Sequence, residues 1–200
     1  MGEIRKPIKK TSIEKKETII RKGFELMCEK GYHNVNCIDI AKYAGVSTGI
    51  IYQYFTDKRD IFVKGVRDYA NNIMFPMINI IDNNKPISKN NFRELLLKMI
   101  NSFIRTHTMK KEAHEELMAM SYLDKEVADI FNDMEMIMTK KISNILISNN
   151  FKCNNIEEKV HILIGIIDNY CHEVVYHKHN DLNYGVMEEE VLNIIMGILT

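Results

Sequence analysis

Apolar residues recur every three or four positions along almost the whole chain, which is the spacing of an α-helix with one buried face. No segment has the clear pattern of a strand, and three prolines and nine glycines in 200 residues favour helices over turns. The pattern predicts an all-α fold of about nine helices. The first helix is expected to run from Ser12 to Lys30, and a long fourth helix to run from Asp57 to a bend or end at Pro76. A turn-rich break follows at residues 82–86. Later helices are expected to start at Ser88 or Asn90, Asp124, Asn155 and Tyr184.

Residues 40–62 have the pattern of two short helices joined by a tight turn. Asn36 is a helix-capping residue, and Asp39 three positions later adds a negative charge that is favourable in a first helical turn. Gly45 supplies the left-handed conformation that ends a helix, and the apolar Val46 follows it. The first of the two helices is therefore expected to end at this glycine.

The second helix is expected to begin after Ser47 and to bury Ile51 and Phe55, which lie four positions apart. At about two turns it is too short to be stable alone, so its neighbours must hold it in place. Its opposite face carries a hydroxyl, a bare backbone, an aliphatic side chain, two phenols and an amide. These groups come from Thr48, Gly49, Ile50, Tyr52, Gln53 and Tyr54.

This mixture of groups is suited to DNA. Hydroxyls and helix N-terminal amides bind phosphates, glutamine can form two hydrogen bonds with adenine, and Ile50 can contact a thymine methyl group. Gly49 removes a side chain where the backbone would approach a phosphate, and Lys58, one turn beyond the helix, is placed to neutralise another phosphate. The same residues also fit a buried pair of helices whose tyrosines only cover a core.

Many positions of this segment agree in one register with a known signature. It resembles the helix-turn-helix of the TetR/AcrR family of transcriptional regulators through the pattern Ile40-Ala41-x-x-Ala44-Gly45-Val46-Ser47-x-Gly49-x-Ile51-Tyr52-x-Tyr54-Phe55-x-x-Lys58. The resemblance covers roughly residues 12–62 and includes the upstream residues Ile19, Phe24, Met27, Gly31 and Tyr32.

The resemblance implies a DNA-binding head of three helices in residues 1–62, followed by an effector-binding and dimerisation domain in residues 63–200. It departs from the family at Asn36, where threonine is usual, and at Gly23, where alanine is usual and where glycine loosens the first helix by about 1 kcal/mol. Family contacts to phosphates and bases come from the positions of Asn36, Thr48, Gly49, Tyr52, Gln53, Tyr54 and Lys58. We expect Ser47 and Ile50 to join them in the DNA-binding set.

Charge is spread unevenly, although the chain as a whole is neutral. Residues 1–64 hold 13 basic and 8 acidic side chains, and the remaining residues hold 14 and 19. A basic head on an acidic body fits a protein that meets nucleic acid with one end, although chance clustering on solvated faces gives imbalances of this size. Residues 1–11 form either a basic arm that reaches DNA or a solubilising tail, with charges on Arg5, Lys6, Lys9 and Lys10.

The last two expected helices are apolar on more than one side. A helix that is apolar all round is buried on both sides, and in a chain of this size the second partner is expected to be another subunit. Two such helices per chain would form a four-helix interface, in which Gly165 and Gly197 allow close approach. The resemblance implies the same homodimer, which would bind a palindromic operator in double-stranded DNA. The apolar residues concerned are Ile162, Leu163, Ile164, Ile166, Ile167, Val191, Leu192, Ile194, Ile195 and Leu199.

Thirteen methionines are many for this length, and such adaptable side chains suit a pocket for varied apolar ligands. Polar groups on otherwise apolar faces would orient a ligand there. The expected pocket residues are Met99, Phe103, His107, Met118, Tyr122, Met134, Met138, Asn169, His172 and Glu173. Each of them fits an ordinary core or surface position equally well.

Metal binding and catalysis have little support. His177 and His179, with Asp168 and His172 on one helical face, could bind a divalent metal, but no third ligand on that helix is evident. The chain lacks a glycine-rich phosphate loop, a nucleophile elbow and an H-E-x-x-H motif, so we expect no enzyme, no cofactor and no metal.

The four cysteines form no C-x-x-C spacing and are typical of reduced thiols in a cytoplasmic protein. No signal peptide, membrane helix or myristoylation pattern is evident, so we expect no membrane partner. The sequence predicts a homodimeric DNA-binding repressor that a small apolar or amphipathic effector releases from its operator. Two hypotheses remain beside it: a family member whose body binds a protein partner, and a small helical metalloprotein.

Overall fold

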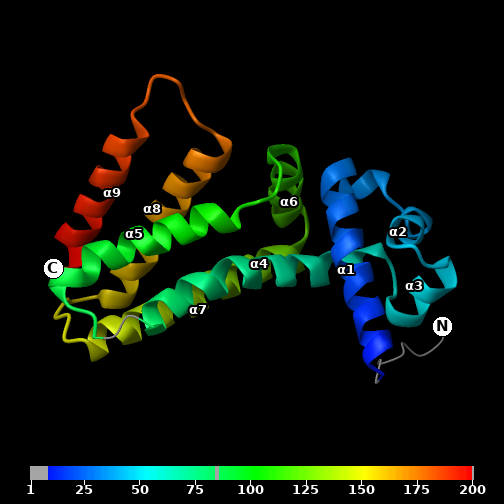
Figure 1. Ribbon diagram of the computed structural model, residues 1–200, viewed down its shortest axis with the longest axis horizontal. Helices are drawn as coiled ribbons and strands as arrows, with labels where there is room; N and C mark the ends of the chain where they lie inside the picture. Colours follow the sequence, from blue (N-terminus) through cyan, green and yellow to red (C-terminus); the bar gives the residue numbers. More distant parts are fainter. Residues whose placement is uncertain (1–8, 84–85, 200) are drawn as a thin grey trace. The chain divides into compact units, whose positions relative to one another are not determined.

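The computed structural model describes residues 9–83 and 86–199, and within them it contains nine α-helices, one short 3-10 helix and no strand (Figure 1). The all-α prediction is confirmed. The elements are α1 (Lys10–Lys30), η1 (Tyr32–Asn34), α2 (Cys37–Ala44), α3 (Thr48–Tyr54), α4 (Lys58–Asn83), α5 (Lys89–Thr106), α6 (Lys111–Leu123), α7 (Lys125–Ser148), α8 (Ile156–Tyr176) and α9 (Tyr184–Leu199).

The helices divide into two compact units that do not follow a single cut in the sequence. Unit 1 comprises the residues up to Ala70 together with residues 109–131, and unit 2 comprises residues 71–108 together with the residues from Asn132 onward. Helices α4 and α7 therefore each contribute residues to both units. The first unit contains the expected DNA-binding segment of residues 1–62 and also α6, which the sequence assigned to the body.

Unit 1 has one apolar core. Helix α1 packs against α2 and α6, and α2 packs against α3. Ile19, Ile40, Ile51 and Phe62 are completely buried, and so is Leu117 of α6. Burying a side chain of this kind stabilises the fold by about 1.5–3 kcal/mol, so α6 is part of what holds the short helices together.

The starts of α4 and α7 are joined by an ion pair within unit 1. Arg59 Nε donates to Asp124 Oδ2 at 2.6 Å, Arg59 Nη2 donates to Asp124 Oδ1 at 2.8 Å, and Glu126 lies 3.0 Å from the same guanidinium. The hydrogen bond with Arg59 lowers the pKa of Asp124. Asp124 Oδ1 also accepts from the amide of Glu126 at 2.9 Å, so it caps α7, which begins one residue after the predicted start.

Unit 2 is a helical bundle in which α5 packs against both α8 and α9, and these two pack against each other. Its largest fully buried side chains are those of Ile100, Leu146, Leu192 and Ile195. None of the helices in the described residues is long and apolar enough to cross a membrane.

Two predicted helix starts differ from the structure, and one of the two alternatives at Pro76 is excluded. Helix α1 begins at Lys10, before Ser12. Of the bend or end predicted at Pro76, the end is excluded, because α4 continues through this proline to Asn83. Asn155 precedes α8 but adopts a left-handed conformation with φ of 54° and forms no cap hydrogen bond, so the capping box that the sequence Asn155-x-x-Glu158 predicts is wrong. Most of the predicted basic arm and residues 84–85 of the predicted break lie outside the described residues.

Candidate nucleic-acid interface

The start of α2 is fixed by reciprocal hydrogen bonds between two side chains and the backbone. Asn36 Oδ1 accepts from the amides of Ile38 at 2.8 Å and Asp39 at 3.1 Å, and Asp39 Oδ2 accepts from the amide of Asn36 at 3.0 Å. This capping box satisfies amides that have no partner inside the helix. Because Oδ1 is used in the cap, a phosphate contact of Asn36 would fall to its Nδ2 group.

The turn between α2 and α3 depends on Gly45, which has φ of 71° and ψ of 34°. The amide of Gly45 donates to the carbonyl of Lys42 at 3.3 Å, and the amide of Val46 donates to the carbonyl of Ala41 at 2.9 Å. Glycine adopts this left-handed conformation without a steric penalty. The predicted helix end at Gly45 is confirmed.

Helix α3 begins after Ser47, whose carbonyl accepts from the amide of Ile50 at 3.0 Å. The Ser47 side chain makes no cap hydrogen bond, although serine at this position was expected to cap the helix through its hydroxyl. The position of the helix start is therefore as predicted, but its backbone supplies the cap contact.

One side of α3 is buried in the core of unit 1. Ile51 is completely buried, and Tyr54 and Phe55 are 4% and 1% exposed. Tyr54 was expected to face outward, and that expectation is wrong, because a residue three positions after Ile51 lies on the same side of a helix. The Tyr54 ring instead lies edge-on to Phe55, with ring centroids 6.5 Å apart.

The other side of α3 is open. Gly49, Tyr52 and Gln53 are exposed, and Thr48 and Ile50 are half-exposed. These five residues form the surface that we call the outer face of α3. It carries the hydroxyl, amide and phenol groups that suit phosphates and base edges.

Tyr52 is the largest side chain of the outer face and is 57% exposed. A side-chain hydrogen bond with Cys37, the first residue of α2, raises the pKa of the Tyr52 phenol. The phenol therefore remains protonated near neutral pH.

Lys58, the first residue of α4, points into the turn between α1 and α2. Its Nζ donates to the carbonyls of Tyr32 at 2.7 Å and Val35 at 2.8 Å, and it lies 4.5 Å from the centroid of the Tyr32 ring. A phosphate contact was expected of this lysine. In the structure its ammonium group satisfies two backbone carbonyls instead.

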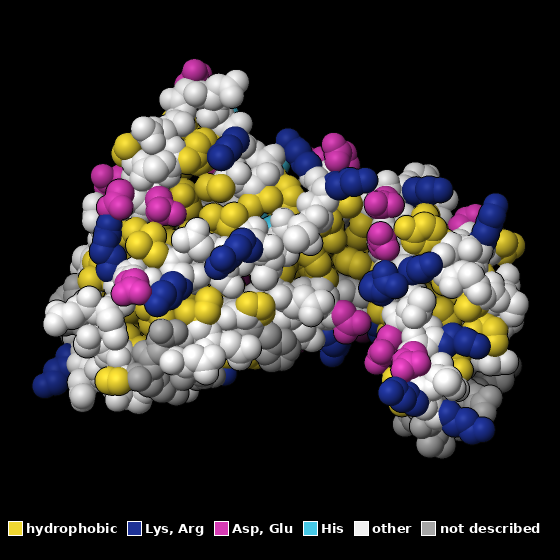
Figure 2. All heavy atoms as spheres, viewed as in Figure 1, with side chains coloured by type: hydrophobic (Ala, Val, Ile, Leu, Met, Phe, Trp, Pro, Cys, Tyr) yellow, Lys and Arg dark blue, Asp and Glu magenta, His cyan; other side chains and the backbone are white. Residues whose placement is uncertain are grey.

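Basic side chains do not form a single block on the face seen in Figure 2, where Lys and Arg lie among Asp and Glu.

The residues expected to line a ligand pocket do not form one cluster. Met118 and Tyr122 belong to unit 1, and Tyr122 is 87% exposed. The other residues of the expected set belong to unit 2, where Asn169 is exposed, Met134 is half-exposed and Met138 is buried. Glu173 accepts a hydrogen bond from the Tyr184 phenol at 3.0 Å.

Three residues of the expected pocket do come together in unit 2. The His107 ring stacks on Phe103 with centroids 4.1 Å apart and lies edge-on to His172 at 5.0 Å. Burial lowers the pKa of His107. Burial also lowers the pKa of His172, but the hydrogen bond and charge of Asp168 outweigh it and raise that pKa above its ordinary value.

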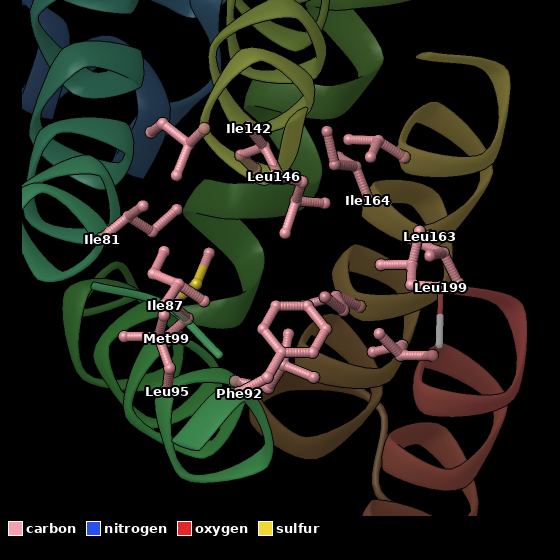
Figure 3. A pocket seen from close by; sticks show the side chains of 15 residues that line it. Ile81, Ile87, Phe92, Leu95, Met99, Ile142, Leu146, Leu163, Ile164 and Leu199 are labelled. Carbon is pink, nitrogen blue, oxygen red and sulfur yellow. The ribbon is translucent and has the colours of Figure 1, made fainter. Parts of the chain in front are cut away.

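A cavity of about 40 Å³ lies elsewhere within unit 2. Figure 3 shows side chains from α5, α7 and α8 converging on it. Of the expected pocket residues only Met99 lines it, and the wall is apolar throughout. It includes Phe92, Leu95, Leu146, Leu163, Ile164 and Leu199. These residues have the helical spacing of an ordinary core, so nothing in the sequence distinguishes the wall of a cavity from a filled interior.

The described part of the chain contains no group of three or more histidine, cysteine, aspartate or glutamate side chains arranged to hold a metal ion. His172 Nδ1 lies 3.2 Å from Asp168 Oδ2, whereas His179 Nε2 lies 3.3 Å from Glu173 Oε1.

Comparison with known proteins identifies the helix-turn-helix. Residues 19–64 match the model of the bacterial regulatory proteins of the tetR family. The helix-turn-helix of this chain is therefore of the tetR type. The match runs from the middle of α1 through α2 and α3 to the first turns of α4, which are the elements that build the outer face of α3.

Two TetR-type relatives extend this finding. IcaR of Staphylococcus aureus, the negative transcriptional regulator of the biofilm operon icaADBC, is 28% identical over 140 residues, which are 63% of this chain and 74% of IcaR. The transcriptional regulator HbdR of Aromatoleum sp. is 48% identical over 48 residues, which are 24% of this chain and 21% of HbdR.

Solved structures show the same fold. A regulator from Mesorhizobium loti assigned to the TetR family matches with a TM-score of 0.75 and 16% identity over 96% of this chain and 98% of its own. A transcriptional regulator from Saccharomonospora viridis, solved in complex with choline, matches with a TM-score of 0.66 and 20% identity over 92% of this chain and 96% of its own. The chain therefore has the helical fold of these regulators, with an N-terminal helix-turn-helix.

Proposed function

We propose that this regulator is a repressor that inserts the outer face of α3 into the major groove of double-stranded DNA. The observation that carries the proposal is the division of α3 into two sides, because Ile51 and Tyr54 anchor the helix while Tyr52 and Gln53 face solvent. Asn36, Ser47 and the residues of the outer face supply the contacts. The role of IcaR as a negative regulator supports repression in preference to activation.

The repressor acts as a homodimer through α8 and α9. Both helices bury one side inside the subunit, yet Ile162 is 59% and Ile194 is 44% exposed. A Cβ atom built on Gly165 or Gly197 meets nothing within 4 Å, so both positions offer open space to a second helix. A two-fold dimer would present two copies of α3 to half-sites about 34–36 Å apart, or a multiple of this spacing.

The effector is a small apolar molecule that binds at the cavity of unit 2, which has to expand from about 40 Å³ to admit a molecule as large as an aromatic ring. All the side chains of its wall are apolar, and burying a charge there without a partner would be costly. A quaternary ammonium such as choline, which the Saccharomonospora regulator holds, is therefore disfavoured in this cavity. An effector that binds more tightly when the two DNA-binding heads are spread than when they match the operator would shift the population away from the DNA-bound form.

Selection of duplexes from a random-sequence pool by the full-length chain tests the DNA-binding part. The expected product is a palindrome whose half-sites are separated by whole turns of DNA. Enrichment of single, unpaired half-sites would contradict the dimeric mode, and failure to enrich any duplex would contradict DNA binding.

A thermal-shift assay with toluene as the apolar probe and choline as the cationic probe tests the effector part. Toluene is expected to raise Tm progressively as its concentration increases, and choline is expected to leave it unchanged. Ile164→Phe, which places a larger ring in the wall, should remove the toluene effect. A Tm increase with choline but not toluene would contradict an apolar effector.

A further inference from the structure

The turn between α1 and α2 is held from two sides by opposite charges. The amide of Tyr32 donates to Glu116 Oε1 of α6 at 2.7 Å, and the carbonyl of Tyr32 accepts from Lys58 Nζ of α4 at 2.7 Å. Lys58 donates a second hydrogen bond, at 2.8 Å, to the carbonyl of Val35. Two charged side chains from helices distant in sequence therefore hold one short segment of backbone, all within unit 1.

This turn has backbone groups that helices cannot satisfy. Gly31 has φ of 88°, which ends α1, and Val35 is extended, so the segment leaves the helical hydrogen-bond pattern before α2 begins. Hydrogen bonds to charged groups are stronger than those between neutral groups and are suited to such a position. The Tyr32 ring is also fixed, because it lies edge-on to Phe62 with centroids 5.1 Å apart.

The turn determines where α2 starts. Asn36, the capping residue of α2, directly follows Val35, and α2 packs against α3, which carries the outer face. A shift of the carbonyls that Lys58 binds would therefore be passed to the cap and to the outer face. If α3 enters a DNA groove, such a shift would change the distance between the start of α2 and the outer face of α3, and so their fit to the DNA.

We propose that Lys58 and Glu116 are positioning residues of the DNA-binding head, and that Lys58 does not neutralise a phosphate. An ammonium group has three donors, and Lys58 directs two of them to the carbonyls of Tyr32 and Val35 with the Tyr32 ring beside it. Glu116 on α6 accepts a hydrogen bond from the amide of Tyr32, and α6 lies outside the segment that resembles the family. The expected effect on DNA binding rests on the proposed function, whereas the hydrogen bonds of Lys58 and Glu116 do not.

Amide hydrogen exchange tests the geometry without DNA. Lys58→Met and Glu116→Ala are expected to speed exchange in residues 31–39 by about tenfold, the effect of losing a charge-assisted hydrogen bond. Glu116→Gln keeps an acceptor oxygen and should restore slow exchange. Lys42→Met on α2 and Glu115→Ala on α6, both exposed, are the matched controls and should exchange like the wild type. Wild-type exchange rates in Lys58→Met or in Glu116→Ala would overturn the proposal.

The salt dependence of DNA binding separates positioning from phosphate contact. The full-length chain and Lys58→Met are titrated with the selected duplex at several salt concentrations. A positioning residue lowers affinity without changing the slope of log K against log [salt], whereas loss of a phosphate contact reduces that slope by about 0.9 for each phosphate. A reduced slope would therefore overturn the proposal for Lys58. If no duplex is selected, the proposed function fails, while the exchange experiment still decides the role of the turn.

Discussion

At the scale of residues, the helix-turn-helix depends on how neighbouring side chains divide between core and solvent. Tyr52 and Tyr54 are two positions apart and of the same type, yet Tyr52 is 57% exposed and Tyr54 is 4% exposed. Successive residues of a helix are rotated by about 100°, so a difference of two positions places a side chain on the other side. Identical chemistry therefore serves packing at one position and contact with a partner at the other.

Alanine substitution at the two tyrosines should have opposite consequences. Tyr54→Ala leaves a cavity in the core of unit 1 and is expected to lower the free energy of unfolding by about 3–5 kcal/mol. Tyr52→Ala removes an exposed ring and is expected to change it by less than about 0.5 kcal/mol while weakening DNA binding. Chemical denaturation measures both variants, and an equal loss of stability would contradict the assigned sides of α3.

His107 should make unit 2 sensitive to acid. Burial lowers its pKa in the folded chain below the ordinary value of 6.5. The unfolded chain therefore binds the proton more readily, and stability falls as the pH drops below about 6.5. His107→Phe should show a smaller loss of unfolding free energy than the wild type between about pH 7 and pH 5. The same acid dependence in both proteins would contradict this assignment.

At the scale of elements, the helix ends show what local sequence can predict. The cap at Asn36 and the stop at Gly45 depend on residues close in sequence and were predicted correctly. Helix α4, in contrast, continues through Pro76. Its packing involves residues remote in sequence, and such packing can outweigh the local effect of a proline.

Two glycines in helices should respond in opposite ways to alanine. A Cβ atom on Gly65 would lie 2.4 Å from Phe24 Cβ, so Gly65→Ala is expected to cost about 2–3 kcal/mol of stability. A Cβ atom on Gly49 would meet only Ser47 Oγ at 3.9 Å, so Gly49→Ala should gain up to about 1 kcal/mol through helix propensity.

Gly49→Ala should nevertheless weaken DNA binding, because the new methyl group lies on the outer face of α3. Thermal denaturation and a binding titration on the same sample check both effects. Tighter DNA binding by Gly49→Ala would contradict the close approach of backbone and phosphate at this position.

At the scale of the whole molecule, the sequence predicted the helical class and the helix-turn-helix but not the composition of the two units. Helix α6 joins unit 1 by packing against α1, and its Glu116 accepts a hydrogen bond from the amide of Tyr32, 84 positions earlier. Periodicity identifies a helix with an apolar face but does not name its partner. For the same reason Met118 and Tyr122 were grouped with Met99, although they lie in different units.

The dimer proposed through α8 and α9 can be tested with two equivalent substitutions. Ile162 on α8 is 59% exposed and Ile137 on α7 is 51% exposed, so a charge at either position leaves the subunit core intact. Ile162→Glu is expected to convert the dimer to monomer, because it buries a charge in the interface. Ile137→Glu should leave the dimer unchanged. Sedimentation velocity distinguishes the species, and a dimer that survives Ile162→Glu would argue for a different interface.

The most direct test of DNA binding by the outer face of α3 is the affinity of Gln53→Ala for the selected duplex, measured by fluorescence anisotropy. Gln53 is exposed on α3, and losing a bidentate contact to a base is expected to cost about 1–3 kcal/mol for each copy of α3. Asn169→Ala, which removes an exposed amide from α8, is the control and should bind like the wild type. Wild-type affinity and sequence preference in a dimeric Gln53→Ala would contradict the placement of α3 in the groove.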